Sequence, residues 1–211
     1  MTIAKDISFR EKLYAEKEFV DLKILCNGKQ FKCHKIVLSC QSEVFKTMIK
    51  NKSLTEKKTR IMKIEENDIS YVVMGRLLYF CYHDKVKNAT MINPDLLLAA
   101  DKYNIQGLLD ECCKYFESKL SLKSALDILV LAETTNQKDL FDAASRFVCK
   151  NTGSLEKSRG YQEMVNENPK MFTRVFSKML EVKQAPKRVQ ATGVNGIEFE
   201  SSSDDSSSDD E

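Results

Sequence analysis

The residues best suited to chemistry form a short cluster near the start of the chain. Cys33, His34 and Cys40 lie in the stretch FKCHKIVLSC, and Cys26 stands a few positions before it. Thiolates and imidazoles are common ligands of zinc, and a thiol can also act as a reactive nucleophile. The cluster therefore raises three possibilities, which are a metal site, a reactive thiol and a purely structural role.

The spacing of this cluster argues against a metal site. Specific zinc sites usually pair their ligands as C-x-x-C or a close variant, twice, so that two pairs converge. Here Cys33 and His34 are adjacent, and neighbours on an extended strand point to opposite faces. Cys26 and Cys33 could approach each other across a hairpin, but a fourth ligand is not evident. Because cysteine is often buried as a small hydrophobe, we expect these thiols to pack in the core, with no metal and no cofactor.

The remaining sequence offers little to an enzyme. The chain has two histidines, and neither His34 nor His83 is linked to a nucleophile and a third orienting group. The motifs G-x-S-x-G, G-x-G-x-x-G and the P-loop are absent. Acidic residues stand mostly at helix caps or on lysine-rich faces, where they are solvated or complement helix dipoles. The sequence therefore predicts a non-catalytic protein.

Composition is that of a globular protein with a real core. The 211 residues are 42% hydrophobic and 30% charged, with only 7 Gly and 3 Pro. The start, MTIAKDISFREKLY, shows no secretory signal, and no window approaches the roughly 18 apolar residues of a membrane span. We therefore expect no membrane partner. The odd number of cysteines, seven, is read as reduced thiols, which favours the nucleus or the cytoplasm.

Charge is unevenly divided along the chain. The last fourteen residues carry seven acidic residues and no basic ones, so residues 1–197 have a net charge of +9 against +2 for the whole chain. The lysines of this basic body are scattered over helix faces rather than gathered in a stripe. We therefore expect no nucleic-acid partner.

The first third of the chain predicts a small sheet with short helices. Residues 19–26, FVDLKILC, alternate in polarity, Asn27-Gly28 follows, and residues 29–33 continue with KQFKC. An Asn-Gly pair between two such runs indicates a β-hairpin, because both residues tolerate the positive φ of a type I′ turn. The spacing of the apolar residues then becomes helical. It predicts a short helix from Ile36 and a second helix capped by Ser42. A loop at 50–59, a strand at 60–64 and a helix capped by Asn67 or Asp68 are expected to follow.

Beyond residue 70 the hydrophobic pattern is almost wholly helical. The last helix is introduced by Asn168-Pro169 as cap and first turn. Five of its apolar residues are expected to face one way: Phe172, Val175, Phe176, Met179 and Leu180. After about residue 183 periodicity is lost, and the low-complexity run SSSDDSSSDDE predicts a disordered tail.

Several short blocks, in order, resemble the BTB/POZ family. The family pattern has an aspartate opening the first strand, then F-x-x-H-[KR]-x-[VI]-L and S-x-x-F. The chain matches it at these positions: Asp21, Phe31, His34, Lys35, Val37, Leu38, Ser42 and Phe45. Further matches follow in residues 77–82, LLYFCY, and 96–112, LLLAADKYNIQGLLDEC. The resemblance implies an α/β (α+β) BTB/POZ fold, in which a small sheet is joined to a helical cluster.

The same resemblance gives three of these residues a structural role. It implies that the Lys35 ammonium lies near the Asp21 carboxylate, at the point where a strand turns into a buried helix. His34, beside them, is expected to make a local hydrogen bond. These residues are the expected signature of the fold.

The resemblance continues beyond residue 120. Residues 124–176 look like the helical extension, BACK/3-box-like, of speckle-type POZ proteins, and the lead-in LYAEKEFVD is similar as well. Those proteins normally carry a substrate-binding MATH domain before the BTB domain. Only about eighteen residues precede the matched region, so we expect this chain to lack a MATH domain. The expected organisation is a leading helix in 1–18, a BTB/POZ domain in 19–120, an all-α extension in 121–183 and an acidic serine-rich tail in 184–211.

In that family the BTB domain binds the N-terminal region of cullin-3 and so forms a ubiquitin ligase. The resemblance therefore implies a non-catalytic cullin-3 adaptor, whose ubiquitination substrate is unknown. A φ-x-E motif before the third strand supports the cullin contact, and Leu54 and Glu56 occupy the matching positions, although a solvated loop could contain the same residues. Tyr82, which matches a tyrosine at the end of the family's long helix, is either a second cullin-binding candidate or a packing residue.

The start of the chain predicts self-association. Ile7, Leu13, Tyr14 and Phe19 place apolar groups on a short leading helix that one small domain could not easily cover. Similar proteins form homodimers through this region, and the alternative is simple packing onto the chain's own domain. The alternative function is a non-ligase oligomerisation module, or a transcriptional scaffold, that pairs with full-length BTB relatives.

The composition of the tail predicts that it is phosphorylated or recognised by another protein. Its serines stand among acidic residues, a context that acidophilic kinases favour, although a merely solubilising tail has the same composition. One part of it also resembles the degron that speckle-type MATH domains bind, with the candidate residues Phe199, Ser201, Ser202 and Ser203.

Overall fold

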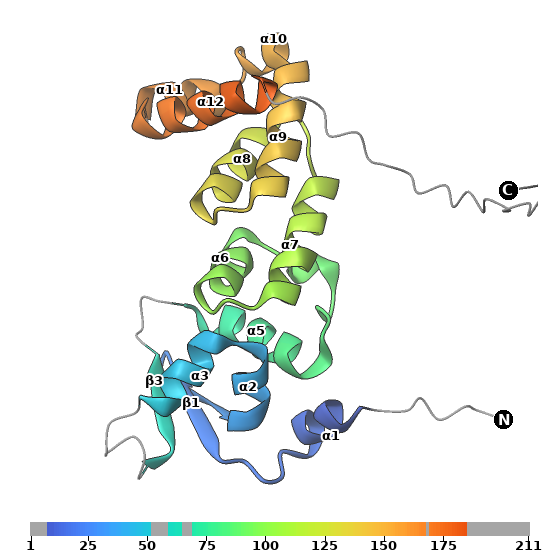
Figure 1. The fold of residues 1–211 in the computed structure, drawn as a ribbon, viewed down its shortest axis with the longest axis vertical. Coiled ribbons are helices and arrows are strands. Elements are labelled where there is room, and N and C mark those ends of the chain that lie inside the picture. Colours follow the sequence, from blue (N-terminus) through green and yellow to red (C-terminus); the bar gives the residue numbers. More distant parts are fainter. Residues whose placement is uncertain (1–7, 52–58, 65–68, 168, 185–211) are drawn as a thin grey trace, which may run out of the picture.

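The computed structural model describes residues 8–51, 59–64, 69–167 and 169–184, with side chains as far as residue 180. Its elements follow one another along an elongated molecule (Figure 1). The strands and the first helices lie at one end, α5 to α7 lie in the middle, and α8 to α12 form the other end (Figure 1).

The sheet is built on the predicted hairpin. β1 (Leu22–Cys26) and β2 (Lys29–Cys33) pair antiparallel, and Asn27 and Gly28 have φ values of 49° and 72°, as a type I′ turn requires. β3 (Ile61–Ile64) pairs parallel to β1, which gives the strand order β2-β1-β3. The predicted hairpin and the strand at 60–64 are therefore confirmed.

Ser42 joins two helices at the edge of the core. It follows α2 (Lys35–Gln41), and its hydroxyl accepts the backbone N–H of Phe45 in the first turn of α3 (Glu43–Lys50). The same hydroxyl donates to the carbonyl oxygen of Tyr103 at 2.5 Å. The predicted cap is confirmed, and it also ties α3 to the middle of the molecule.

The next helix begins later than the sequence predicted. α5 (Tyr71–His83) is capped by Ser70, whose hydroxyl accepts the backbone N–H of Val73 at 3.3 Å. The prediction that Asn67 or Asp68 caps this helix is wrong. Those two residues lie outside the described part of the chain.

The middle of the molecule is a helical core around α5. α5 buries seven of its residues. After the short 3-10 turn η1 (Ala89–Met91), α6 (Pro94–Lys102) packs against α5, and α7 (Gln106–Ser118) packs against α6. The ring of Phe80 in α5 also lies next to Gly107 of α7. Leu96, Leu97 and Ala100 of α6 have no exposed surface, so one face of this helix is fully enclosed by the core.

The helical extension has five helices among the described residues: α8 (Ala125–Thr134), α9 (Lys138–Lys150), α10 (Thr152–Leu155), α11 (Arg159–Glu167) and α12 (Pro169–Gln184). In α12, Val175 and Met179 are buried, but Leu180 is 58% exposed. The prediction that Leu180 faces the same way is wrong, because residues 175 and 179 share a row of the helix and residue 180 lies about 100° further round.

The cysteines of the opening cluster are mostly part of the core. Cys26 and Cys33 are buried, whereas Cys40 is exposed, so the expectation of core packing fails for Cys40. Burial raises the pKa of the Cys33 thiol to about 12, which keeps it protonated at neutral pH. Within the described ranges, all seven cysteines are free thiols and no three metal-binding side chains converge. In the same ranges, no helix is long and apolar enough to cross a bilayer.

Candidate interaction surfaces

Asp21 fixes the start of α2. Its carboxylate accepts the backbone N–H of Lys35 at 2.8 Å, which satisfies one of the amide groups that a helix leaves unpaired in its first turn. Among the described residues, no ion pair within 4.0 Å joins the Lys35 ammonium to this carboxylate. The two residues do meet as predicted, and the hydrogen bond that joins them comes from the backbone N–H of Lys35.

His34 bridges distant parts of the chain. Ring atom Nε2 lies 2.5 Å from the carbonyl oxygen of Glu18, and Nδ1 lies 2.9 Å from the hydroxyl of Tyr82. A carbonyl oxygen can only accept, so Nε2 carries the hydrogen, and in a neutral ring Nδ1 then accepts the Tyr82 hydroxyl. The backbone N–H of His34 donates to the same hydroxyl at 2.9 Å. The expectation of a local hydrogen bond is wrong, since these partners are 16 and 48 residues away.

Tyr82 is part of this buried junction. Its side chain is 2% exposed, and burial raises the pKa of its phenol. A side chain so enclosed has no surface to offer another protein. The prediction that Tyr82 binds cullin is therefore wrong, and of the two alternatives the packing residue is the one that the structure supports.

Other predicted site residues lie outside the described part of the chain. They are the cullin-binding candidates Leu54 and Glu56, the dimer candidate Ile7, and the tail candidates Phe199, Ser201, Ser202 and Ser203.

The leading helix α1 (Phe9–Glu16) is docked on the end of α5. The ring of Tyr14 contacts the rings of Tyr79, Tyr82 and His83, with centroids 4.9 to 5.7 Å apart. Arg10 forms a bidentate ion pair with Asp84, directly after α5. Leu13 also packs against the core. For Leu13 and Tyr14, packing onto the chain's own domain is thus the alternative that the structure supports.

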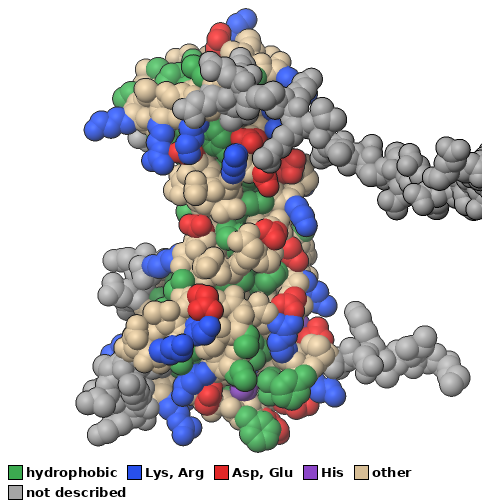
Figure 2. All heavy atoms as spheres, viewed as in Figure 1, with side chains coloured by type: hydrophobic (Ala, Val, Ile, Leu, Met, Phe, Trp, Pro, Cys, Tyr) green, Lys and Arg blue, Asp and Glu red, His purple; other side chains and the backbone are tan. Residues whose placement is uncertain are grey.

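Aromatic surface remains uncovered near this helix. Phe9 is 74% exposed and Phe19 is 84% exposed, and Figure 2 shows hydrophobic side chains gathered at the end of the molecule where α1 lies. Phe19 also has a φ of 55°, a conformation that bulky residues seldom adopt. Two large apolar rings are therefore left in solvent at this end of the described structure.

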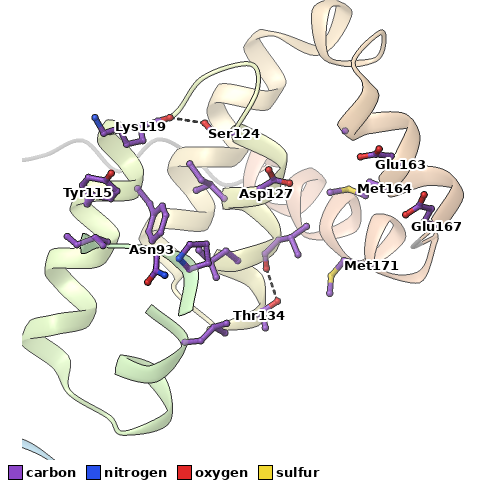
Figure 3. Close-up of a pocket in the computed structure, with 18 residues that line it drawn as sticks. Asn93, Tyr115, Lys119, Ser124, Asp127, Thr134, Glu163, Met164, Glu167 and Met171 are labelled. Atoms are coloured by element: carbon purple, nitrogen blue, oxygen red, sulfur yellow. Dashed lines mark hydrogen bonds between the residues drawn. The ribbon is translucent and has the colours of Figure 1, made fainter. Parts of the chain in front are cut away.

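A large hollow lies between the middle helices and the extension. We call it the interdomain groove. Its volume is about 760 Å³, and apolar side chains dominate its walls (Figure 3). Each neighbouring helix contributes, and representative wall residues are Leu98 of α6, Phe116 of α7, Leu131 of α8, Met164 of α11 and Met171 of α12.

Charged groups at the rim of the groove are mainly acidic. Asp127, Glu163 and Glu167 line it together with one cation, Lys119. Glu163 is paired with Arg159 at 2.5 Å, whereas neither Asp127 nor Glu167 has an ion-pair partner within 4.0 Å among the residues that the structure describes. The groove therefore combines apolar walls with a negative rim. Sequence reasoning missed it, because its wall residues follow the helical periodicity of a buried core.

Comparison with known proteins shows to which family the chain belongs. A family model of the BTB/POZ domain matches residues 11–120, more than half of the chain. This chain belongs to the BTB/POZ family. Its fold is accordingly the BTB/POZ fold, with a small three-stranded sheet, a helical core and a helical extension.

Two curated BTB/POZ relatives match a longer part of the chain. Protein maternal effect lethal 26 of Caenorhabditis elegans is 27% identical over 170 residues, which are 80% of this chain and 42% of the relative. Kelch-like protein 21 of Danio rerio is 32% identical over 153 residues, 72% of this chain and 24% of the relative. The chain thus spans less than half the length of each relative.

A solved BTB domain also matches part of the chain. The BTB domain of human gigaxonin is 22% identical and covers 55% of this chain and 96% of its own, with a TM-score of 0.41.

Proposed function

We propose that this BTB/POZ protein is a non-catalytic adaptor that binds cullin-3 and promotes the ubiquitination of a partner bound elsewhere on it. The observation that carries the proposal is the interdomain groove, which lies where the BTB/POZ core meets the helical extension. A protein that docks there contacts both parts at once. The chain's role is then geometric, since it holds two proteins in a fixed arrangement.

The groove has the properties of a protein-docking site. Hot spots of protein interfaces are apolar or aromatic side chains that fill well-formed pockets, while surrounding charges select the partner. Leu98 is 40% exposed in a wall of the groove, so apolar surface is open to a partner before binding. The negative rim favours a segment that carries Lys or Arg beside its apolar side chains. We propose that such a segment of cullin-3 occupies the groove.

The φ-x-E residues complete the proposed cullin surface. Leu54 and Glu56 remain predictions from the family resemblance, because they lie outside the described residues. The leucine would fill a shallow apolar pocket on cullin-3, and the carboxylate would orient a donor.

We also propose that the protein is a dimer through its leading segment. Phe9 and Phe19 supply exposed aromatic surface beside α1, and burying such rings between two copies is strongly favourable. The same surface favours the alternative function, in which the chain pairs with full-length BTB relatives without recruiting a ligase.

A binding measurement with the N-terminal region of cullin-3 tests the proposal. We expect the full chain to bind, and we expect Leu54→Asp/Glu56→Lys to abolish binding. We expect Leu98→Asp to weaken binding about tenfold or more, because it places a carboxylate in the apolar wall. Leu180→Asp is the matched control, since Leu180 is an exposed helical leucine outside the groove.

The outcomes separate the two functions. Failure of the unmodified chain to bind cullin-3 would contradict the adaptor and favour the oligomerisation module. Binding that Leu98→Asp and Leu180→Asp weaken equally would show that cullin-3 does not use the groove.

A further inference from the structure

A buried carboxylate connects the two helical layers that border the groove. Glu133 of α8 is 3% exposed, and its two oxygens accept from different side chains of α12. The Nε of Arg174 donates to Oε1 at 2.6 Å, and the Nζ of Lys178 donates to Oε2 at 2.6 Å. Lys178 also lies 5.7 Å from the ring centroid of Phe141 in α9. We call Glu133, Arg174 and Lys178 the Glu133 clasp.

The clasp gives the contact between α8 and α12 a direction that apolar packing alone lacks. Val175 and Met179 bury one face of α12, but apolar contact is non-directional and tolerates sliding and rotation. Charge-assisted hydrogen bonds from residues one helical turn apart, to the two oxygens of one fixed carboxylate, allow only a narrow range of positions. The clasp therefore fixes the register and rotation of α12 on α8.

α12 in turn positions the outer wall of the groove. That wall consists of α11 and the start of α12, including Glu163, Met164 and Met171 (Figure 3). Within the described structure, no residue of α11 is fully buried, so this helix has little core of its own. It is joined to α12 through the rings of Tyr161 and Phe172, whose centroids lie 5.6 Å apart. The position of α11 therefore depends on α12, and also on a direct contact with α8, where the side chain of Leu126 lies next to Gly160.

The opposite wall belongs to α8 itself. Leu131 lines the groove from the same helix that carries Glu133. The distance between the two walls therefore depends on how α12 docks on α8, which is the contact that the clasp makes, together with the direct contact of α11 with α8.

We propose that the Glu133 clasp holds the groove open at the width its partner needs, so that Glu133, Arg174 and Lys178 are positioning residues for partner binding although none of them lines the groove. The proposal deepens the proposed function and rests on it for the identity of the partner. The proposal thus gives the Glu133 clasp a role in partner recognition, although the clasp does not lie in the groove where the partner would bind.

Two measurements on the full chain test this inference. The first is hydrogen exchange of residues 159–184 without any partner, with α5 as the internal reference for an intact BTB/POZ core. The second is the affinity for the N-terminal region of cullin-3. The variants are Glu133→Gln, which keeps the size but removes the charge, and Lys178→Met, at a position that is partly exposed. Glu117→Gln, at an exposed position outside the clasp, is the control.

We expect Glu133→Gln and Lys178→Met to speed exchange in α11 and α12, to leave α5 unchanged and to weaken cullin-3 binding about tenfold. Lys178→Arg keeps the charge and should retain both the slow exchange and the affinity. Glu117→Gln should behave as the unmodified chain.

Two results would overturn the inference. Unchanged exchange in residues 159–184 of Glu133→Gln would show that the clasp does not fix α12. Faster exchange with unchanged affinity would show that the clasp is structural and does not position the groove. If the unmodified chain fails to bind cullin-3, the proposed function fails with it, and the exchange rates alone decide whether the clasp holds the wall.

Discussion

His34 shows how one side chain can hold three segments together. Its ring and backbone both bond the hydroxyl of Tyr82 in α5, while its other ring nitrogen bonds the carbonyl of Glu18, between α1 and β1. All of these polar groups are buried or half-buried, so each lost bond leaves a group that water cannot easily reach. The role of His34 is thus architectural.

Tyr82→Phe is the direct test of this junction. Removing the hydroxyl leaves the backbone N–H of His34 without an acceptor and its Nδ1 without a donor, so we expect the free energy of unfolding to fall by about 1–3 kcal/mol. Chemical denaturation measures this change. Tyr115→Phe is the control, because the Tyr115 hydroxyl has no hydrogen-bond partner among the described residues, and its effect should stay within about 0.5 kcal/mol. Equal effects of the two substitutions would show that the junction contributes nothing.

The Glu133 clasp predicts a dependence on pH. Burial raises the pKa of Glu133, but hydrogen bonds from Lys178 and Arg174 outweigh it, so the pKa lies below its ordinary value of about 4.5. A carboxyl group whose pKa is lower in the folded state than in the unfolded state stabilises the fold at pH values above its ordinary pKa. This stabilisation is lost as the pH falls through the lower pKa of the folded state.

We therefore expect the attachment of α12 to weaken as the pH falls below about 4.5. Hydrogen exchange of residues 169–184, corrected for the intrinsic effect of pH, measures it. In the Glu133→Gln variant, the weakening of α12 attachment below about pH 4.5 should disappear. A variant with the same pH dependence as the unmodified chain would exclude Glu133 as the group responsible.

At the scale of elements, α1 is attached by two kinds of contact of unequal strength. The Arg10–Asp84 ion pair has side chains that are 36% and 49% exposed, and such surface pairs typically contribute no more than about 1 kcal/mol. Tyr14 instead packs its ring against three aromatic rings of α5. The aromatic contact is therefore the main attachment.

This difference predicts the behaviour of two variants. Tyr14→Ala should release α1 and make residues 8–17 sensitive to limited proteolysis, with a loss of about 1–3 kcal/mol in attachment. Arg10→Ala should change the cleavage rate much less. If Arg10→Ala releases α1 as readily as Tyr14→Ala, then the ion pair, and not the ring packing, holds the helix.

Local chemistry explains which elements were predictable. The hairpin at Asn27-Gly28 and the cap at Ser42 depend on the conformational preferences of single residues, and both were found as predicted. The cap of α5 was missed because Ser70 competes with two equally good cap residues just before it. The direction of Leu180 was missed because an apolar residue in a helical pattern is ordinarily assigned to the core.

At the scale of the whole molecule, the groove could not be read from the sequence. Its walls come from residues as far apart as Ile92 and Met171, and each wall residue by itself has the spacing of a core residue. Only the packing of α11 and α12 at a distance from α7 leaves these side chains uncovered. The cullin-binding surface predicted from the family, at Leu54 and Glu56, stays a prediction.

The proposed dimer makes a separate prediction. Phe9→Ser/Phe19→Ser should weaken self-association about tenfold or more, because it removes two exposed rings from the proposed interface. Sedimentation velocity over a range of micromolar concentrations measures this. The unfolding free energy of the monomer should change little, since neither side chain is in the core. Val72→Ser, at another exposed apolar position, is the control. A chain that sediments as a monomer before substitution would contradict the dimer.

The most direct test of the adaptor function is a calorimetric titration of the full chain with the N-terminal region of cullin-3. We predict saturable binding with one cullin-3 per chain, lost in Leu54→Asp/Glu56→Lys, weakened about tenfold by Leu98→Asp and unaffected by Leu180→Asp. The absence of binding by the unmodified chain would contradict the proposed function.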